Sequence, residues 1–310
     1  MKELFKIYLF IFFICGWTAE QSWGAACCGS SSSLPSLIIG DESAQLGIGF
    51  SMESVIGDAG SERFSVFRAD ADHEKLQSLR ISGAMLLSDR WQIGGAIPLS
   101  YRSREVGFQS AHSSGLGDVS LNLGYELLPE WEYSSWKPHG FLFWNLLLPT
   151  GKSVDQSHLP WSVDAFGKGF LTASTGMVFS KVLRSWTFLI QAEVHYSFSR
   201  AIDDPEGRYQ LIPGWGGSLG LNAGYVVSRL PLSFHLGVQP QWDMGIQSSG
   251  SIASQSGGRM VWNATSQCTY SIDQDWNIGL TYLDQTLIGP ARNTTLSRSV
   301  ALNLQKAWQR

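Results

Sequence analysis

The sequence predicts an all-β chain that closes into a transmembrane, antiparallel, up-and-down β-barrel of the outer-membrane type, with about 12 strands. Three observations lead to this prediction. The chain begins with an apolar leader that indicates export. Apolar and polar residues then alternate in stretches of about ten residues, and the connections between these stretches are alternately short and long.

The composition excludes several classes of protein. Only 15% of the 310 residues are charged, whereas 12% are aromatic and 13 residues are tryptophan. A mean hydropathy of -0.03 is too low for a bundle of membrane helices. The formal net charge of -4, from 22 basic and 26 acidic residues, does not favour a nucleic-acid partner.

The leader has the layout of a secretory signal peptide, which we predict to span residues 1–25. Lys2 and Lys6 flank the start of the apolar run LFKIYLFIFFICGW, and small residues follow in SWGAAC, with cleavage after Ala25 or Ala26. The run is too short to be a comfortable membrane span. We therefore expect export, and the cell outer membrane as the location.

Residues 26–43 are expected to form a periplasmic N-terminal tail, and residues 44–310 the barrel. Three cysteines remain after cleavage, Cys27, Cys28 and Cys268, and an odd number gives no disulfide framework. Lipidation of Cys27 is an alternative, although Gly24 stands where a lipobox normally has leucine. A metal or thiol role for the pair would need further ligands, which its neighbours do not supply, so we expect no metal and no cofactor.

Two-residue periodicity begins just after residue 43. One row of apolar residues, for example, is Leu46, Ile48, Phe50 and Met52, and the opposite parity is small or polar. Ten alternating residues are enough to cross a bilayer at a tilt. Residues 139–150 are apolar on both parities and residues 170–180 alternate weakly, but both are counted as strands.

The connections alternate in length in the way expected of an outer-membrane barrel. Short ones lie around 88–90, 181–185, 228–231 and 272–275, and longer ones at 57–74, 103–117, 151–169, 199–214, 243–258 and 284–294; residues 129–138 are intermediate. Tight turns belong to the periplasmic side and long loops to the outside, with both termini in the periplasm.

Aromatic residues recur next to the short turns. Strand starts carry Trp91, Trp186 and Trp276, and strand ends carry Tyr125, Tyr225, Tyr270 and Trp308. These residues could be ordinary core aromatics of a soluble β-protein, but their register with the turns favours a girdle at the membrane interface, where an apolar ring with a polar tip is stable.

Two motifs resemble a known family. GLGDVSLNLGYEL (115–127) opens the fourth strand, and LLLPTGKS (146–153) closes the fifth. They resemble the outer-membrane family described as transporters of the phenol meta-cleavage (MetA) pathway, and the resemblance implies a barrel that admits small aromatic or apolar compounds. From the residues themselves we expect structural roles: Gly115 and Gly117 for a sharp turn, Pro149 for a strand end, and Lys152 at the polar rim.

The parity that faces the lumen carries most of the charged residues of the strands. The candidates that line the lumen are Glu53, Arg80, Arg102, Glu126, Glu193, His195 and His235, with Phe141 and Phe143 as an apolar patch for a permeating solute. Opposed charges in a narrow barrel can brace one another, or they can form a constriction that selects solutes by charge. Both hypotheses stay open.

The leading hypothesis is a channel or transporter that passes small molecules through the outer membrane. The alternative is a closed structural or surface-display barrel. The third is a barrel hydrolase built on Glu193, His195 and Ser197, which share one strand parity. Residues 70–75, DADHEK, offer oxygen ligands for a cation, but a solvated loop is the better interpretation. We expect no enzyme, and as partners the outer-membrane lipid, a small solute and the barrel-assembly machinery.

Overall fold

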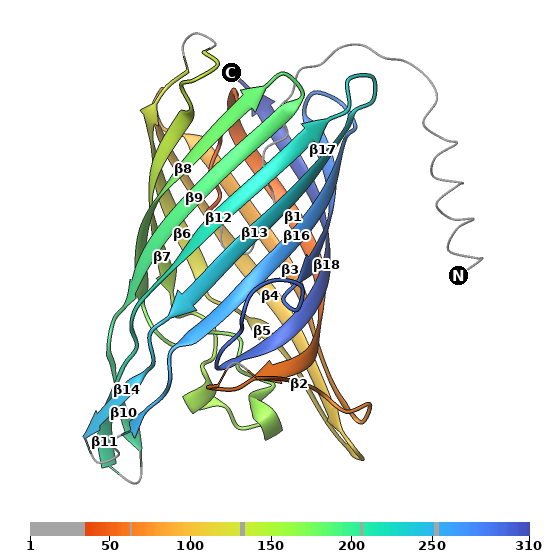
Figure 1. Cartoon of the computed structure of the whole chain (residues 1–310). Helices are drawn as coiled ribbons and strands as arrows, with labels where there is room; N and C mark the ends of the chain where they lie inside the picture. Colours follow the sequence, from red (N-terminus) through yellow and green to blue (C-terminus); the bar gives the residue numbers. More distant parts are fainter. Residues whose placement is uncertain (1–34, 63, 131–133, 205–206, 251–253) are drawn as a thin grey trace, which may run out of the picture.

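In the computed structural model, which describes residues 35–62, 64–130, 134–204, 207–250 and 254–310, twelve long strands form one closed antiparallel barrel (Figure 1). They are β1 (Glu42–Ala59), β3 (Asp72–Leu86), β4 (Trp91–Val106), β6 (Val119–Leu128), β7 (His139–Leu148), β8 (Thr172–Leu183), β9 (Trp186–Ser197), β12 (Gly214–Val226), β13 (Leu232–Asp243), β16 (Arg259–Ser271), β17 (Trp276–Asp284) and β18 (Thr294–Gln309). Strand β18 pairs with β1 and closes the barrel. The predicted twelve-stranded fold is confirmed, and the two irregular segments form β7 and β8.

Shorter strands belong to the loops. They are β2 (Ser65–Phe67), β5 (Gln109–Leu116), β10 (Arg200–Asp204), β11 (Gly207–Ile212), β14 (Gln247–Gly250) and β15 (Ser254–Gln255). Strands β10, β11, β14 and β15 pair into a separate small sheet. Two 3-10 turns, η1 (Val154–Gln156) and η2 (Pro160–Ser162), lie in the loop after β7. No helix in the described part of the chain has the length and hydrophobicity needed to cross a membrane.

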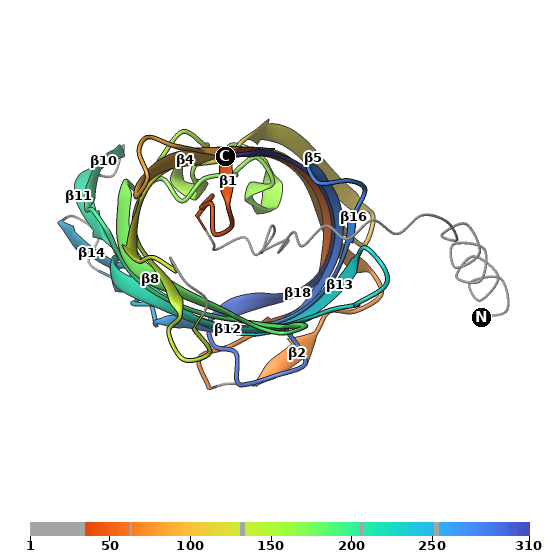
Figure 2. The same cartoon turned by 90° about the horizontal axis from the view of Figure 1, so that it is seen from above.

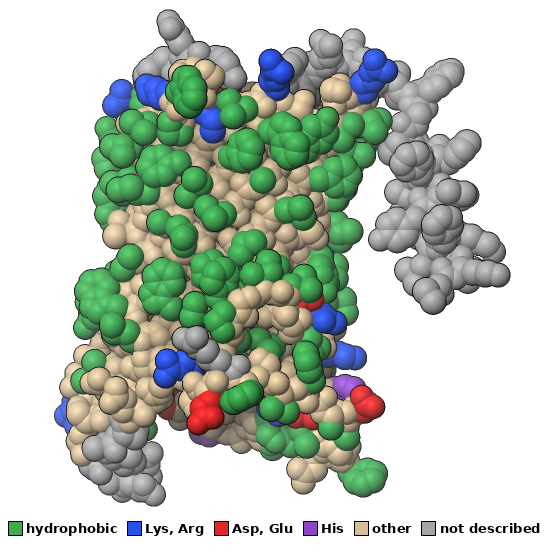
Figure 3. Space-filling model, in the orientation of Figure 1, with side chains coloured by type: hydrophobic (Ala, Val, Ile, Leu, Met, Phe, Trp, Pro, Cys, Tyr) green, Lys and Arg blue, Asp and Glu red, His purple; other side chains and the backbone are tan. Residues whose placement is uncertain are grey.

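The two faces of the barrel wall have opposite polarity. On β1, the apolar row Leu46, Ile48, Phe50 and Met52 is 43–52% exposed, whereas inward-facing Gln92 is 1% exposed. An outer surface of exposed apolar side chains around a polar interior is the pattern of a barrel that sits in lipid. Figure 3 shows the apolar side chains as a broad band around the middle, with charged residues towards the two rims.

The two ends of the barrel differ. One end, here called the turn end, carries the C-terminus and the connections 87–90, 129–138, 184–185, 227–231 and 272–275. The other, the loop end, carries the connections 60–71, 107–118, 149–171, 198–213, 244–258 and 285–293 (Figure 1). The alternation of connection lengths follows the prediction, and the intermediate connection 129–138 lies at the turn end.

The described chain starts inside the barrel. Residues 35–40, here called the N-terminal segment, fold into the lumen at the turn end before β1 begins at Glu42 (Figure 2). Of the expected tail, residues 26–43, the last two residues belong to β1 and residues 35–40 lie in the lumen. Residues 26–34 of that tail, Cys27 and Cys28, and the predicted signal peptide lie outside the described residues.

Candidate functional site

The lumen holds a cavity of about 390 Å³ along the wall formed by β1, β3, β13 and β16 to β18. Twelve of the 25 residues that line it carry a hydroxyl or an amide side chain: Ser36, Gln45, Ser51, Ser82, Gln241, Asn263, Thr281, Gln285, Ser297, Ser299, Asn303 and Gln305. Three charged residues, Glu53, Arg80 and Arg259, also line it, and Pro35 to Leu37 bound one part. A strand turns every second side chain inward, so the polar parity of six strands builds this surface.

The opposite wall of the lumen carries one buried apolar cluster among polar side chains. Phe141 and Phe143 on β7, Val178 on β8 and Leu189 on β9 form a buried cluster. Leu37 of the N-terminal segment completes this cluster, and Phe143 is fully buried. The two phenylalanines face inward as predicted from their parity, but they are covered, so they do not offer an open apolar patch to a solute.

Hydrogen bonds hold the N-terminal segment against the wall. The Ile38 N–H donates to Gln92 Oε1 at 2.6 Å, and Gln92 Nε2 donates back to the Ile38 carbonyl at 3.1 Å. Gln45 Nε2 donates to the Leu37 carbonyl at 2.9 Å, and Asn122 Nδ2 to the Ser36 carbonyl at 2.9 Å. Buried backbone groups outside a ladder need such partners, and three inward amides of the wall supply them.

Two glycines make room for the N-terminal segment. A Cβ on Gly94 would lie 2.5 Å from the Ser36 carbonyl oxygen, and one on Gly124 would lie 2.6 Å from Leu37 Cδ2. Both distances are shorter than any normal contact, so a side chain at either position would force the segment to move. The sequence of β4 and β6 is therefore matched to an occupied lumen at the turn end.

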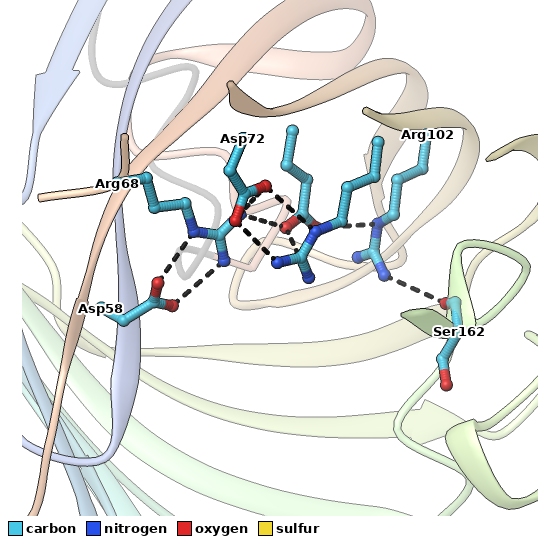
Figure 4. A network of polar contacts seen from close by, with 7 residues as sticks. Asp58, Arg68, Asp72, Arg102 and Ser162 are labelled. Atoms are coloured by element: carbon cyan, nitrogen blue, oxygen red, sulfur yellow. Dashed lines mark hydrogen bonds and ion pairs between the residues drawn. The ribbon is translucent and has the colours of Figure 1, made fainter. Parts of the chain in front are cut away.

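A network of charges braces the wall at the loop end (Figure 4). Arg68 pairs with Asp58 at 2.8 Å and with Glu74 at 2.7 Å, and Arg104 pairs with Asp72 at 3.1 Å. The network crosses β1, β3 and β4. Asp72 and Glu74 belong to the stretch considered for a cation, and here arginines engage both of them. Among the described residues, no group of three acidic, histidine or cysteine side chains could hold a metal ion.

The same network reaches the loop after β7. Arg102 donates to the Ser162 carbonyl at 3.5 Å, and its guanidinium lies 6.0 Å from the Phe166 ring centre. The Arg104 guanidinium lies 5.8 Å from the Trp161 ring centre, and both placements suit cation–π attraction. On the other side, Arg200 pairs with Asp155 at 2.9 Å. The loop is thus tied to β4 of the barrel wall on one flank and to β10 of the small sheet on the other.

The two sequence motifs meet in this loop. Asp118 accepts hydrogen bonds from the Gly151 N–H at 3.0 Å and the Lys168 N–H at 2.7 Å, and Thr150 Oγ1 donates to the Gly117 carbonyl at 2.8 Å. Lys152 forms an ion pair with Asp164 inside the loop, rather than reaching out to the rim.

The glycines of the first motif also act differently from the expectation. Neither Gly115 nor Gly117 has a positive φ. Instead, a Cβ on Gly115 would lie 2.6 Å from the Phe166 ring, and one on Gly117 would lie 2.9 Å from Pro98. They permit close packing of the loop. The hydrogen bonds between the two motifs hold residues 149–171 against the start of β6.

All nine predicted lumen residues lie on the inward parity of their strands, but only Glu53 and Arg80 line the cavity. Glu126 pairs with His139 at 2.7 Å, and His195 Nε2 shares a hydrogen bond of 2.9 Å with Asp243. His235 contacts Ser233 at 3.2 Å. Glu193 also faces inward beside His195. Several of these charges therefore have a partner on a neighbouring strand, and the bracing and constriction hypotheses both stay predictions.

The arrangement considered for a hydrolase is not assembled. The Ser197 hydroxyl is hydrogen-bonded to Thr172 Oγ1 at 2.7 Å, and His195 is engaged by Asp243. Nucleophilic catalysis needs the hydroxyl within hydrogen-bond reach of its base. The neighbouring positions on β9 therefore reflect strand parity and do not form a relay.

The aromatic residues near the turns lie on the outward parity at the turn end, and their role as a girdle at the membrane interface stays a prediction. The Trp91 and Tyr125 ring centres are 4.8 Å apart, and those of Trp186 and Tyr225 are 5.1 Å apart. Tyr270 is on the same parity of β16. Lys306 Nζ lies 5.3 Å from the Trp276 ring centre and 5.1 Å from the Trp308 ring centre.

A second set of outward aromatic residues, not expected from the sequence as an interfacial group, lies towards the loop end: Tyr101, Tyr196, Trp215, Trp242 and Tyr282. The Tyr196 and Trp215 rings are 4.9 Å apart. The place of the N-terminal segment inside the lumen was not expected either. The apolar run Leu37-Ile38-Ile39 could have indicated a buried segment, and aromatic residues at the loop ends of the predicted strands could have indicated the second set.

The fold is similar to known outer-membrane barrels. An outer-membrane channel from Pseudomonas putida F1 gives a TM-score of 0.65 with 14% sequence identity, over 90% of this chain and 100% of that chain. The β domain of the Bordetella autotransporter BrkA gives 0.46 with 14% identity, over 86% and 100% of the two chains. The monoaromatic hydrocarbon channel CymD gives 0.39 with 11% identity, over 87% and 90%. No family model and no curated protein matches the sequence.

Proposed function

We propose that the protein is an outer-membrane channel for small molecules. The observation that carries the proposal is the polar cavity of about 390 Å³ inside a closed barrel with an apolar outer face. A barrel of twelve strands is wider than the filled eight-stranded kind. The fold that the chain shares with the outer-membrane channel from Pseudomonas putida F1 supports the proposal.

The cavity favours small solutes that carry hydrogen-bonding groups. Its volume is near the lower end of the range of about 300–1,000 Å³ that is usual for ligand sites, which suits a molecule of one ring. The resemblance of residues 115–127 and 146–153 to transporters of the phenol meta-cleavage pathway supports an aromatic solute. The hydroxyl and amide lining favours a hydroxylated or carboxylated aromatic over a bare hydrocarbon.

Passage requires movement at the turn end. The N-terminal segment occupies the lumen there and bounds the cavity, so a solute leaves towards that end only when the segment is displaced. The residues around Leu37 act as a plug that is anchored by one leucine and a few amide hydrogen bonds. The lumen-lining candidates on the cavity wall, Glu53 and Arg80, are the ones that would meet the solute.

The proposed location is the outer membrane, with the turn end in the periplasm. A signal peptide of residues 1–25 would direct export, and the barrel-assembly machinery would insert the chain. The apolar band, with aromatic residues at both of its ends, supports contact with the hydrocarbon layer of the membrane.

A liposome-swelling assay tests the proposed function. Purified full-length protein in liposomes should admit arabinose and small aromatic alcohols faster than protein-free liposomes do, and should exclude larger oligosaccharides. Rates equal to those of protein-free liposomes for every solute would favour the second candidate, a closed structural barrel. The filled turn end is the observation that keeps this candidate in consideration.

A further inference from the structure

One basic side chain in the cavity, that of Arg80, has no ion-pair partner among the described residues. Arg80 lies mid-way along β3 with its side chain on the inward parity, and it lines the cavity. Among the residues that the structure describes, Arg80 takes part in neither an ion pair nor a hydrogen bond. Every other inward arginine of the barrel has such a partner: Arg102 and Arg104 pair with acidic residues of β3, and Arg259 pairs with Asp243 at 3.8 Å.

The acidic residue in the same cavity does not neutralise Arg80. Arg80 pairs in register with Gly49 on β1, whereas Glu53 pairs with Leu76. The two positions are four steps apart along the strand, or about 13 Å at the usual rise. Glu53 in turn has no basic partner among the described residues. The cavity thus holds one unpaired cation and one unpaired anion, at different heights.

The wall around Arg80 leaves room for a ligand and offers hydrogen bonds. Its register partner Gly49 pairs on its other side with Asn303, and a Cβ on Gly49 would lie 2.3 Å from Asn303 Oδ1, so the glycine makes room for the Asn303 amide at the level of Arg80. Ser82, two residues along the same parity, and Asn303 both line the cavity. On the turn side, Gln305 donates to Gln45 at 2.7 Å and continues the polar surface.

The chemistry of this site selects its ligand. A guanidinium is always charged, and its planar fork matches the two oxygens of a carboxylate. An unpaired cation in a narrow lumen attracts anions and repels cations. A carboxylate that reached Arg80 would also find hydroxyl and amide donors beside it.

We propose that Arg80 is the anion-binding residue of a subsite in the lumen cavity that takes small organic monocarboxylates of about the size of one aromatic ring. The proposal rests on the proposed function for its place in a transport path. The binding event itself requires only that the carboxylate can enter the cavity.

Calorimetric titration of the full-length protein in detergent with sodium benzoate tests the subsite. Wild type should bind benzoate at millimolar concentration or tighter, and Arg80→Gln should weaken the binding at least tenfold. Glu53→Gln, the matched control with the opposite charge in the same cavity, should bind at least as well as wild type. Heat-modifiable migration on gels checks that each variant is a folded barrel.

Arg80→Lys keeps the charge but loses the fork, so it should bind with intermediate affinity. Benzyl alcohol, which has the same ring without the charge, should bind less well than benzoate and should not distinguish wild type from Arg80→Gln. Equal benzoate affinity in wild type and Arg80→Gln, or no binding to wild type, would overturn the proposal.

A second measurement separates the subsite from the channel function. In planar bilayers under a sodium benzoate gradient, Arg80→Gln should shift the reversal potential towards cation selectivity. Benzoate binding that depends on Arg80, without any solute uptake in the swelling assay, would support the subsite and contradict the channel. Uptake and reversal potentials that are the same in wild type and Arg80→Gln would support the channel and contradict the subsite.

Discussion

Removing the anchor of the N-terminal segment should open the turn end. Leu37 is 7% exposed and packs in the apolar cluster with Phe141, Phe143, Val178 and Leu189. Replacing such a buried leucine by alanine costs about 2–5 kcal/mol. Leu37 precedes β1 and takes no part in strand pairing, so the loss falls on docking of the segment and not on the barrel. Even the lower end of this range changes the ratio of docked to undocked segment by about thirtyfold.

Single-channel recording of Leu37→Ala in planar bilayers measures this change. The variant should spend a far larger fraction of time at high conductance than wild type, with unchanged heat-modifiable migration. Leu302→Ala is the control, because it makes the same chemical change on the outward parity of β18. If Leu37→Ala and wild type gave the same conductance levels and the same dwell times, the N-terminal segment would not be what limits the path.

The remaining predictions concern the wall, the loop and the topology. Leu302→Arg, on the lipid face, should destabilise the barrel by about 2–4 kcal/mol in urea unfolding, whereas Ala301→Arg beside it, on the cavity wall, should cost much less; equal costs would contradict the two-faced wall. Hydrogen bonds from a lysine and a serine hold the pKa of Asp164 well below its usual range, so the contact is complete at neutral pH; its contribution to stability begins to fall only below pH about 4 and is lost as the pH passes through the lowered pKa. Asp164→Asn should therefore expose the loop after β7 to chymotrypsin at pH 7, and unchanged cleavage would show that the contact does not hold the loop. In a chain with its native cysteines replaced by serine, Val154→Cys should react with an impermeant maleimide on intact cells and Ser88→Cys should not; the reverse pattern would invert the barrel.

The strands of this protein could be predicted because their signal is local. Residues Leu46 to Met52 carry the two-residue alternation within a single strand, and lipid on one side with water on the other imposes it on every strand. The connection lengths then order the strands without any knowledge of distant contacts. Even β7, which is apolar on both parities, follows this logic, since Phe141 and Phe143 face an apolar segment in the lumen.

The contents of the lumen could not be predicted in the same way, because they depend on contacts between residues far apart in the chain. Gln92 and Ile38 are 54 residues apart, and nothing in either stretch identifies the other as its partner. Asp118 likewise holds the backbone of Gly151 and Lys168 across two connections. The position of a charged residue in the two-residue alternation predicts whether it faces inward. Whether it has a partner, as Glu126 has in His139, depends on how neighbouring strands are aligned.

The most direct test of the channel is the wild-type protein in a planar bilayer. Insertion of purified full-length protein should produce discrete conductance steps, small because the N-terminal segment narrows the path, and the liposomes made from the same preparation should take up small polar solutes. No conductance steps, together with solute uptake no faster than in protein-free liposomes, would contradict the proposed channel and favour a closed structural barrel.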